Sequence, residues 1–137
     1  MIIQGSCLCG EVTYEVSGPF VSAMNCHCSR CRRAHGAAFA SYAEVKPEQF
    51  RWLSGEELVS TYGGGKGAYC FCSKCGSNVA ATWEGEVLEV TLGTLEGDPG
   101  INPDYHQHVG SKAPWHEITD GKTQYDEGFS GASDEDA

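Results

Sequence analysis

The chain concentrates its chemistry in residues 25–33, Asn25-Cys26-His27-Cys28-Ser29-Arg30-Cys31-Arg32-Arg33, where three cysteines lie beside three arginines. Thiolates are ligands that Zn²⁺ selects, and a Cys-x-x-Cys turn can bring two sulfurs onto one ion. Three thiolates leave one position of a tetrahedron open, as in zinc enzymes, whereas structural sites fill all four positions. This stretch therefore predicts a metal site with room for a further ligand.

Length and charge limit the classes of function. We expect one β domain over residues 1–126, followed by an acidic, disordered tail at 127–137. The formal net charge of −10 argues against nucleic acid and anionic membranes as partners. No apolar run approaches the roughly 20 residues that cross a bilayer, and the N-terminus lacks a signal-peptide pattern. We therefore expect a cytoplasmic protein, in which eight cysteines bind metal rather than form disulfides.

Hydrophobic patterning predicts strands rather than helices. Polar and apolar residues alternate at 11–16, and Gly18-Pro19 ends that strand. Further strands are expected at 20–24, 38–45, 58–62, 68–72, 78–83, 86–95 and 105–109, with a helical turn at 47–50. No segment has a helical apolar period over 11 or more residues. The fold class is therefore mainly β with little helix, and residues 25–33 are expected in a strand-to-strand turn.

A second group of cysteines predicts a structural metal site. Cys72-Ser73-Lys74-Cys75-Gly76 has the form of a zinc knuckle, in which glycine permits the positive φ that closes the turn. Cys7 and Cys9 can supply the remaining ligands, because residues i and i+2 of an extended segment point to one face. Cys70 is left over. It can share the face of Cys72, be a further metal ligand that closes the second site, or be a buried free thiol.

Four motifs in order give the chain its family resemblance. They are Gly5-Ser6-Cys7-Leu8-Cys9-Gly10, Cys26-His27-Cys28-Ser29-Arg30-Cys31-Arg32-Arg33, Phe71-Cys72-Ser73-Lys74-Cys75-Gly76-Ser77 and Val109-Gly110-Ser111-Lys112-Ala113-Pro114-Trp115-His116. The chain resembles the glutathione-dependent formaldehyde-activating enzyme family, whose domain is shared with centromere protein V. The resemblance implies a β-tent of antiparallel strands stapled by zinc-knuckle turns, with two zinc ions per chain.

Residue by residue, the resemblance implies a structural zinc on Cys7, Cys9, Cys72 and Cys75 and a catalytic zinc on Cys26, Cys28 and Cys31. Cys70 departs from the family pattern, because a non-cysteine is expected there. The implied reaction is addition of glutathione to formaldehyde, giving S-hydroxymethylglutathione, and its reverse, formally a carbon–sulfur lyase reaction.

Positive side chains are needed beside this site, because Zn²⁺ with three cysteinates is already negative before the carboxylates of glutathione arrive. Arg30, Arg32 and Arg33 suit those carboxylates, since the guanidinium pairs with them bidentately. Lys112, Trp115 and His116 are further candidates for the substrate cleft, by family resemblance. His27 is expected to face away from the metal, and His106 and His108, on one strand face, to be exposed.

Two other classes of function compete with this interpretation. The first is an enzyme of the same fold that acts on another thiol or on a glutathione adduct, because fold does not fix substrate. The second is a zinc-stapled binding module without catalysis, in which Cys70 closes the second site. A binder of nucleic acid or cytoskeleton is disfavoured by the charge of −10. The oligomeric state is not predicted.

Overall fold

The computed structural model describes residues 1–63 and 65–128, whose strands form two sheets. The smaller sheet has the order β1-β2-β5, and the larger has the order β11-β10-β3-β4-β9-β8-β7-β6. The strands are β1 (Ile2–Ser6), β2 (Thr13–Ser17), β3 (Ser22–Cys26), β4 (Ala40–Glu44), β5 (Phe50–Ser54), β6 (Val59–Tyr62), β7 (Gly67–Cys72), β8 (Asn78–Trp83), β9 (Glu86–Thr91), β10 (Tyr105–Gln107) and β11 (Thr123–Gln124). Pairing is antiparallel except where β10 joins β3 and β11. The mainly β fold class is confirmed.

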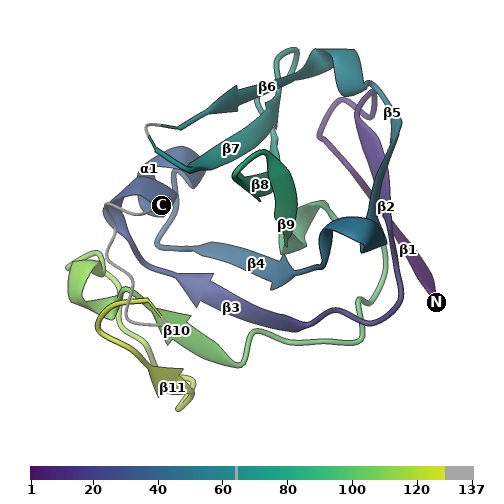
Figure 1. Cartoon of the computed structure of the whole chain (residues 1–137). Helices are drawn as coiled ribbons and strands as arrows, with labels where there is room; N and C mark the ends of the chain where they lie inside the picture. The colour runs from purple at the N-terminus through teal and green to yellow at the C-terminus, as the bar shows by residue number, and fades with distance from the viewer. Residues whose placement is uncertain (64, 129–137) are drawn as a thin grey trace.

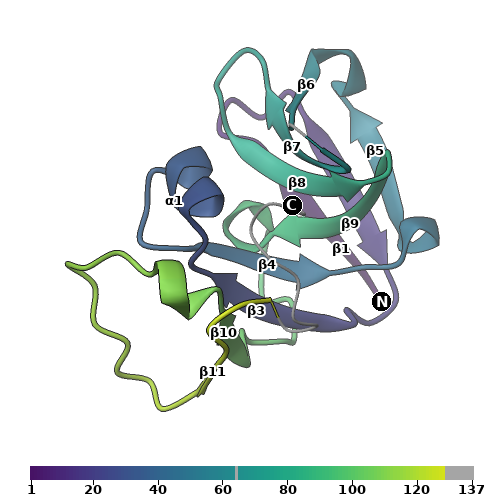
Figure 2. The ribbon, with the colours of Figure 1, turned by 60° about the vertical axis from the view of Figure 1, so that its left-hand side comes forward.

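The larger sheet curves from β3 and β4, through β9 and β8 in the middle of the view, to β7 and β6 (Figure 1). In that view β6 and β7 run along the top, β3, β4 and β10 along the bottom, and the β1-β2-β5 sheet closes the right side. The α-helix of the described residues, α1 (Ser29–His35), lies beside the ends of β3 and β4 in both views (Figure 2). The arrangement agrees with the expected tent of strands.

The two faces of the larger sheet pack against two different clusters of side chains. Residues on alternate positions of β4 show this, because Ala43 packs in one cluster with Val16 and Val90, whereas Tyr42 packs in another around the cysteines of residues 26–31. The first cluster is the core between the two sheets. The second surrounds the candidate active site, so one sheet supplies both the core and the walls of the site.

Gly5 shows how tightly the smaller sheet packs. It lies opposite Tyr14 across β1 and β2, and a Cβ atom on Gly5 would lie 2.2 Å from the Tyr14 ring. The fully buried Tyr14 also shares a hydrogen bond of 2.7 Å between its hydroxyl and Thr94 Oγ1. Any side chain at position 5 would displace this aromatic anchor.

Most of the predicted strands are present, and the differences have local causes. The expected strand at 86–95 ends at Thr91 because a 3₁₀ turn follows, and β1, β5 and β11 were not predicted. The 3₁₀ turns are η1 (Pro47–Gln49), η2 (Glu56–Leu58), η3 (Leu92–Thr94) and η4 (Val109–Ser111). The predicted tail at 127–137 lies outside the described residues from position 129 onward.

The expectation of a simple strand-to-strand turn at residues 25–33 is wrong. The helix α1 begins inside this stretch, because the Cys28 side chain accepts a hydrogen bond from the backbone N–H of Cys31 and so caps the first turn. It ends at Gly36, whose left-handed backbone (φ 59°) favours glycine. A helix of seven residues is too short to show an apolar period.

Candidate metal centres and active site

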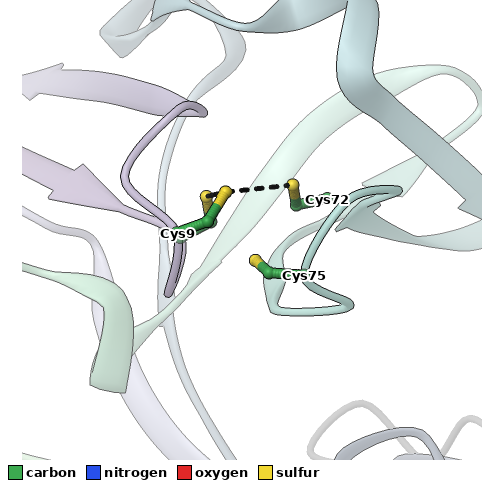
Figure 3. A group of neighbouring side chains, drawn as sticks. Cys9, Cys72 and Cys75 are labelled. Carbon is green, nitrogen blue, oxygen red and sulfur yellow. Dashed lines mark hydrogen bonds between the residues drawn. The ribbon is translucent and has the colours of Figure 1, made fainter.

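The first group of sulfurs joins two turns that are far apart in sequence. Cys7 and Cys9 follow β1, while Cys72 ends β7 and Cys75 lies in the turn after it. The Cys7 and Cys9 sulfurs are 3.5 Å apart, the Cys9 and Cys72 sulfurs 3.9 Å apart, and all four lie within 4.8 Å of one another. Figure 3 shows Cys9, Cys72 and Cys75 pointing toward one another from these turns.

The four cysteines predicted to share one metal site do lie together. The prediction that Cys7 and Cys9 lie in an extended segment is wrong. Cys7 and Cys9 lie in a tight turn, closed by a hydrogen bond of 3.1 Å from the Gly10 N–H to the Cys7 carbonyl, rather than in an extended segment. The turn, and not the alternation of a strand, brings both sulfurs to one side. Backbone hydrogen bonds from Cys9 and Ser77 lower the pKa of Cys75 to about 6, which favours its thiolate.

The second group contains three sulfurs and is buried. Cys26 ends β3, Cys28 caps α1 and Cys31 lies in its first turn, and their sulfurs lie within 4.8 Å of one another. Each of the three is at most 6% exposed. Hydrogen bonds from the Cys26 and Cys31 thiols lower the pKa of Cys28, so a thiolate is favoured in this group even before a metal binds. The Tyr69 hydroxyl lies 3.4 Å from the Cys31 sulfur.

Cys70 belongs to neither group among the described residues. It is 2% exposed and packs in the core between the two sheets, on the opposite side of β7 from Tyr69. Burial raises its pKa to about 11 and so keeps the thiol neutral. This geometry favours the buried thiol over a further metal ligand.

The donors of both groups suit zinc by their chemistry, and the spacing of the first group fits as well. A tetrahedron with Zn–S bonds of about 2.3 Å has sulfur–sulfur edges of about 3.8 Å. The sulfur–sulfur distances of 3.5 and 3.9 Å in the first group bracket this value. All eight cysteines lie in the described residues, and none forms a disulfide. The two cysteine groups are therefore compatible with metal ions, one with four sulfurs and one with three.

The sequence did not reveal a buried chain of hydrogen bonds beside the second group. His27 Nε2 lies 2.8 Å from His106 Nδ1, and His106 Nε2 lies 2.9 Å from Asp120 Oδ2. His27 is 0% exposed and its pKa is lowered to about 4, chiefly by burial, so its ring is neutral at pH 7. The expectation that His106 and His108 would be exposed is wrong, because both are buried.

The comparisons with known proteins agree with this geometry. The sequence profile of the family described as glutathione-dependent formaldehyde-activating enzyme matches residues 2–111. The chain belongs to this family. A Halomonas elongata protein, provisionally named a glutathione-dependent formaldehyde-activating enzyme, is 28% identical over 98% of this chain and 91% of its own length. The crystal structure of a Rhodobacter sphaeroides protein is 28% identical, with a TM-score of 0.57, over 89% of this chain and 98% of that one.

The three arginines that the sequence analysis proposes for substrate binding lie on α1 and point in two directions. Arg33 is exposed, while Arg32 is half-buried and its Nε donates to the Ser111 carbonyl at 3.2 Å. Because helical residues are spaced by about 100°, Arg30 and Arg33 share one side and Arg32 faces another. Arg32 therefore connects α1 to the loop that follows β10. Arg30 and Arg33 extend from a different side of the helix.

That loop carries the other candidates from the family motif. Lys112 Nζ donates to the carbonyl groups of Ala113 and His116, so it braces the loop. The His116 ring packs against Phe39 at a centroid distance of 5.5 Å. Trp115 is 71% exposed, so it is no part of the core and is available to a ligand. No helix in residues 1–63 and 65–128 is long and apolar enough to span a membrane.

Proposed function

We propose that this protein is a zinc-dependent enzyme that adds glutathione, or a similar thiol, to formaldehyde and catalyses the reverse reaction. The observation that carries the proposal is the difference between the two cysteine groups. One has four sulfurs, as a structural site needs, and the other has three, while the remaining cysteine, Cys70, packs in the core between the sheets. Membership of the glutathione-dependent family supports a thiol as the partner.

Cys26, Cys28 and Cys31 would hold the catalytic zinc, and Cys7, Cys9, Cys72 and Cys75 the structural one. A zinc ion held by these three thiolates would supply Lewis acidity, which would lower the pKa of a substrate thiol. The protein's own contribution begins with burial, because a dry site strengthens every electrostatic interaction within it. The Tyr69 hydroxyl, against the Cys31 sulfur, orients that ligand.

The basic residues near the second cysteine group would balance the negative charge of the thiolates and of glutathione. Three cysteinates and a substrate thiolate outweigh the charge of one zinc ion, and glutathione adds two carboxylates. Arg32, held by Ser111, offers a preorganised guanidinium to a carboxylate, and Arg30 and Arg33 offer a second direction from α1. Lys112, Trp115 and His116 would form the wall on the opposite loop. We place the reaction in the reducing cytoplasm, where cysteine ligands remain thiols.

The experiment compares Cys31→Ser with Cys70→Ala in zinc content and in calorimetric titration with glutathione. We expect two zinc ions and glutathione binding in the wild type, and the same in Cys70→Ala. Cys31→Ser should keep one zinc ion and lose the binding. If Cys70→Ala instead loses one zinc ion and the wild type binds no glutathione, the second site is closed and the protein is a binding module. A panel of thiols with formaldehyde then separates glutathione from other substrates.

A further inference from the structure

Glu89 of β9 lies on the face of the larger sheet that also borders the second cysteine group. Val90 packs in the core between the sheets, so Glu89 and Thr91, its neighbours on β9, point to the other face. On that face Thr91 lies opposite Tyr42, which packs with Cys26, Cys28 and Cys31. Glu89 is therefore on the same face as the candidate active site.

The strand register places Glu89 in a row with the tyrosine that touches the cysteine group. Glu89 lies opposite Ala81 on β8, and Ala81 lies opposite Tyr69 on β7. The backbones of Tyr69 and Glu89 are thus two strands, about 10 Å, apart. Because the residue between them is alanine, no long side chain from β8 separates the carboxyl group from the Tyr69 hydroxyl and its Cys31 contact.

Two polar side chains of this strand lack a partner. Among the described residues, the half-buried Glu89 carboxyl group takes part in no side-chain hydrogen bond or ion pair, and its directly opposite neighbour on β4, Glu44, is also acidic. The Thr91 hydroxyl is buried and has no hydrogen-bond partner. An unpaired hydroxyl inside a protein carries a free-energy cost, so the buried Thr91 hydroxyl, on the same strand and sheet face as the half-buried Glu89 carboxyl group, points to a polar group supplied by the substrate.

Burial, the charge of Glu44 and the charge of Cys28 raise the pKa of Glu89 to about 7, so the carboxyl group is near half-protonation at neutral pH. Four titratable groups interact electrostatically with it, namely Glu44 and Tyr42 of β4, Tyr105 of β10 and Cys28 at the start of α1. Tyr69 of β7 lies in the same row of the sheet, and the basic residues of α1 stand against these tyrosines, His35 at 2.9 Å from the Tyr42 hydroxyl and Arg30 near Tyr69.

We propose that Glu89 is the proton donor to the carbonyl oxygen of the aldehyde, with Thr91 as a hydrogen-bonding neighbour of that oxygen. The inference rests on the proposed function. As the substrate sulfur forms its bond to carbon, the electron pair of the C=O π bond moves to oxygen, and that oxygen takes the Glu89 proton. The thiol releases one proton for each proton that the oxygen gains, so Glu89 is reprotonated without a co-reactant. In the reverse direction the carboxylate removes the hydroxyl proton.

The test uses zinc-loaded wild type, Glu89→Gln and, as a matched control from the same strand, Glu86→Gln, whose carboxylate is exposed. Exchange between glutathione and S-hydroxymethylglutathione is measured by NMR above the uncatalysed rate. We expect Glu89→Gln to lower the catalysed rate about a hundredfold, as general acid catalysis predicts, while zinc content and glutathione affinity stay within about threefold of wild type. Glu86→Gln should keep the wild-type rate.

A second measurement is independent of activity. Carboxyl ¹³C NMR of the zinc-loaded wild type should show one glutamate that titrates near pH 7, and this signal should be missing in Glu89→Gln. A wild-type rate in Glu89→Gln, or a Glu89 carboxyl that titrates like an exposed glutamate, overturns the inference and leaves the proposed function intact. A wild type that does not accelerate the exchange at all overturns both. If Glu89→Gln does not fold, the wild-type titration alone decides.

Discussion

His27 Nε2 and His106 Nδ1 are 2.8 Å apart, although the two residues are separated by 79 positions in the chain. The Asp120 carboxylate accepts from His106 Nε2–H, so in a neutral His106 ring Nδ1 is the acceptor and His27 Nε2–H is the donor. This chain fixes the tautomer of a fully buried ring next to two candidate zinc ligands. It also ties the loop around Asp120 to the end of β3.

Replacing His106 by leucine should destabilise the protein. The side chain is similar in size, but His27 Nε2–H would lose its acceptor inside the protein, which costs about 1–3 kcal/mol. Denaturant unfolding of the zinc-loaded protein measures the change in the free energy of unfolding. Asp120→Asn is the matched control, because an amide oxygen can still accept and the side chain is 40% exposed, so we expect a smaller loss than in His106→Leu. Equal losses in the two variants would contradict a specific role for the buried histidine pair.

Cys75→Ser should remove the structural zinc and unfold or strongly destabilise the chain. The first cysteine group connects the turn after β1 to the turn after β7, and the binding energy of a structural zinc is folding energy. Zinc content and near-UV circular dichroism report the loss. Ser73→Ala, in the same turn and exposed, should leave both unchanged. A Cys75→Ser protein that is as stable as wild type would argue that the four sulfurs carry no structural metal.

Tyr69→Phe should weaken zinc binding at the second group alone. The variant removes the hydroxyl that lies 3.4 Å from the Cys31 sulfur, and partners of metal ligands typically contribute about tenfold or more to affinity. Competition with a chelator separates the two sites by their release rates. Tyr62→Phe is the control, since Tyr62 lies opposite Tyr69 on β6 but is 74% exposed. The same release rates in wild type and Tyr69→Phe would remove this hydroxyl from the site.

The stability of the protein should depend on pH through Glu89. Its pKa is raised from 4.5 to about 7 in the folded state, so between these values the folded protein keeps a proton that the unfolded chain releases. The contribution is complete below pH 4.5 and is lost as pH rises through 7, by up to about 3 kcal/mol. Glu89→Gln removes this dependence. We therefore expect the variant to gain stability relative to wild type between pH 5 and pH 8 in thermal unfolding, and a constant difference would refute the raised pKa.

Arg32→Gln should lower the affinity for glutathione about tenfold with unchanged zinc content, because Ser111 already orients the guanidinium. Calorimetric titration at two salt concentrations measures it. Arg51→Gln is the control, since Arg51 pairs with Glu15 on the smaller sheet. If both variants bind glutathione like the wild type, Arg32 has no part in substrate binding.

Local sequence was sufficient for much of the fold. The alternation at residues 11–16 and the turn signal at Gly85 predicted strands that the structure contains as β2, β8 and β9, because a strand with one buried face repeats every two residues. The strand β5 was not predicted, and its residues are mostly exposed or half-buried, so it lacks a clean alternation. Helix α1 escaped prediction because a cysteine, rather than serine or aspartate, caps it.

Local sequence patterns were enough to predict the mainly β class and the sorting of seven cysteines into a group of four and a group of three, because metal ligands come in short motifs that local spacing reveals. Strand pairing in three dimensions was needed to establish that Cys70 faces the core, that His27 meets His106, and that Glu89 lies on the sheet face of the second cysteine group. Each of these depends on which strands pair and in which register. A shift of one residue would turn every side chain of a strand to the opposite face, and no local pattern in the sequence specifies that register.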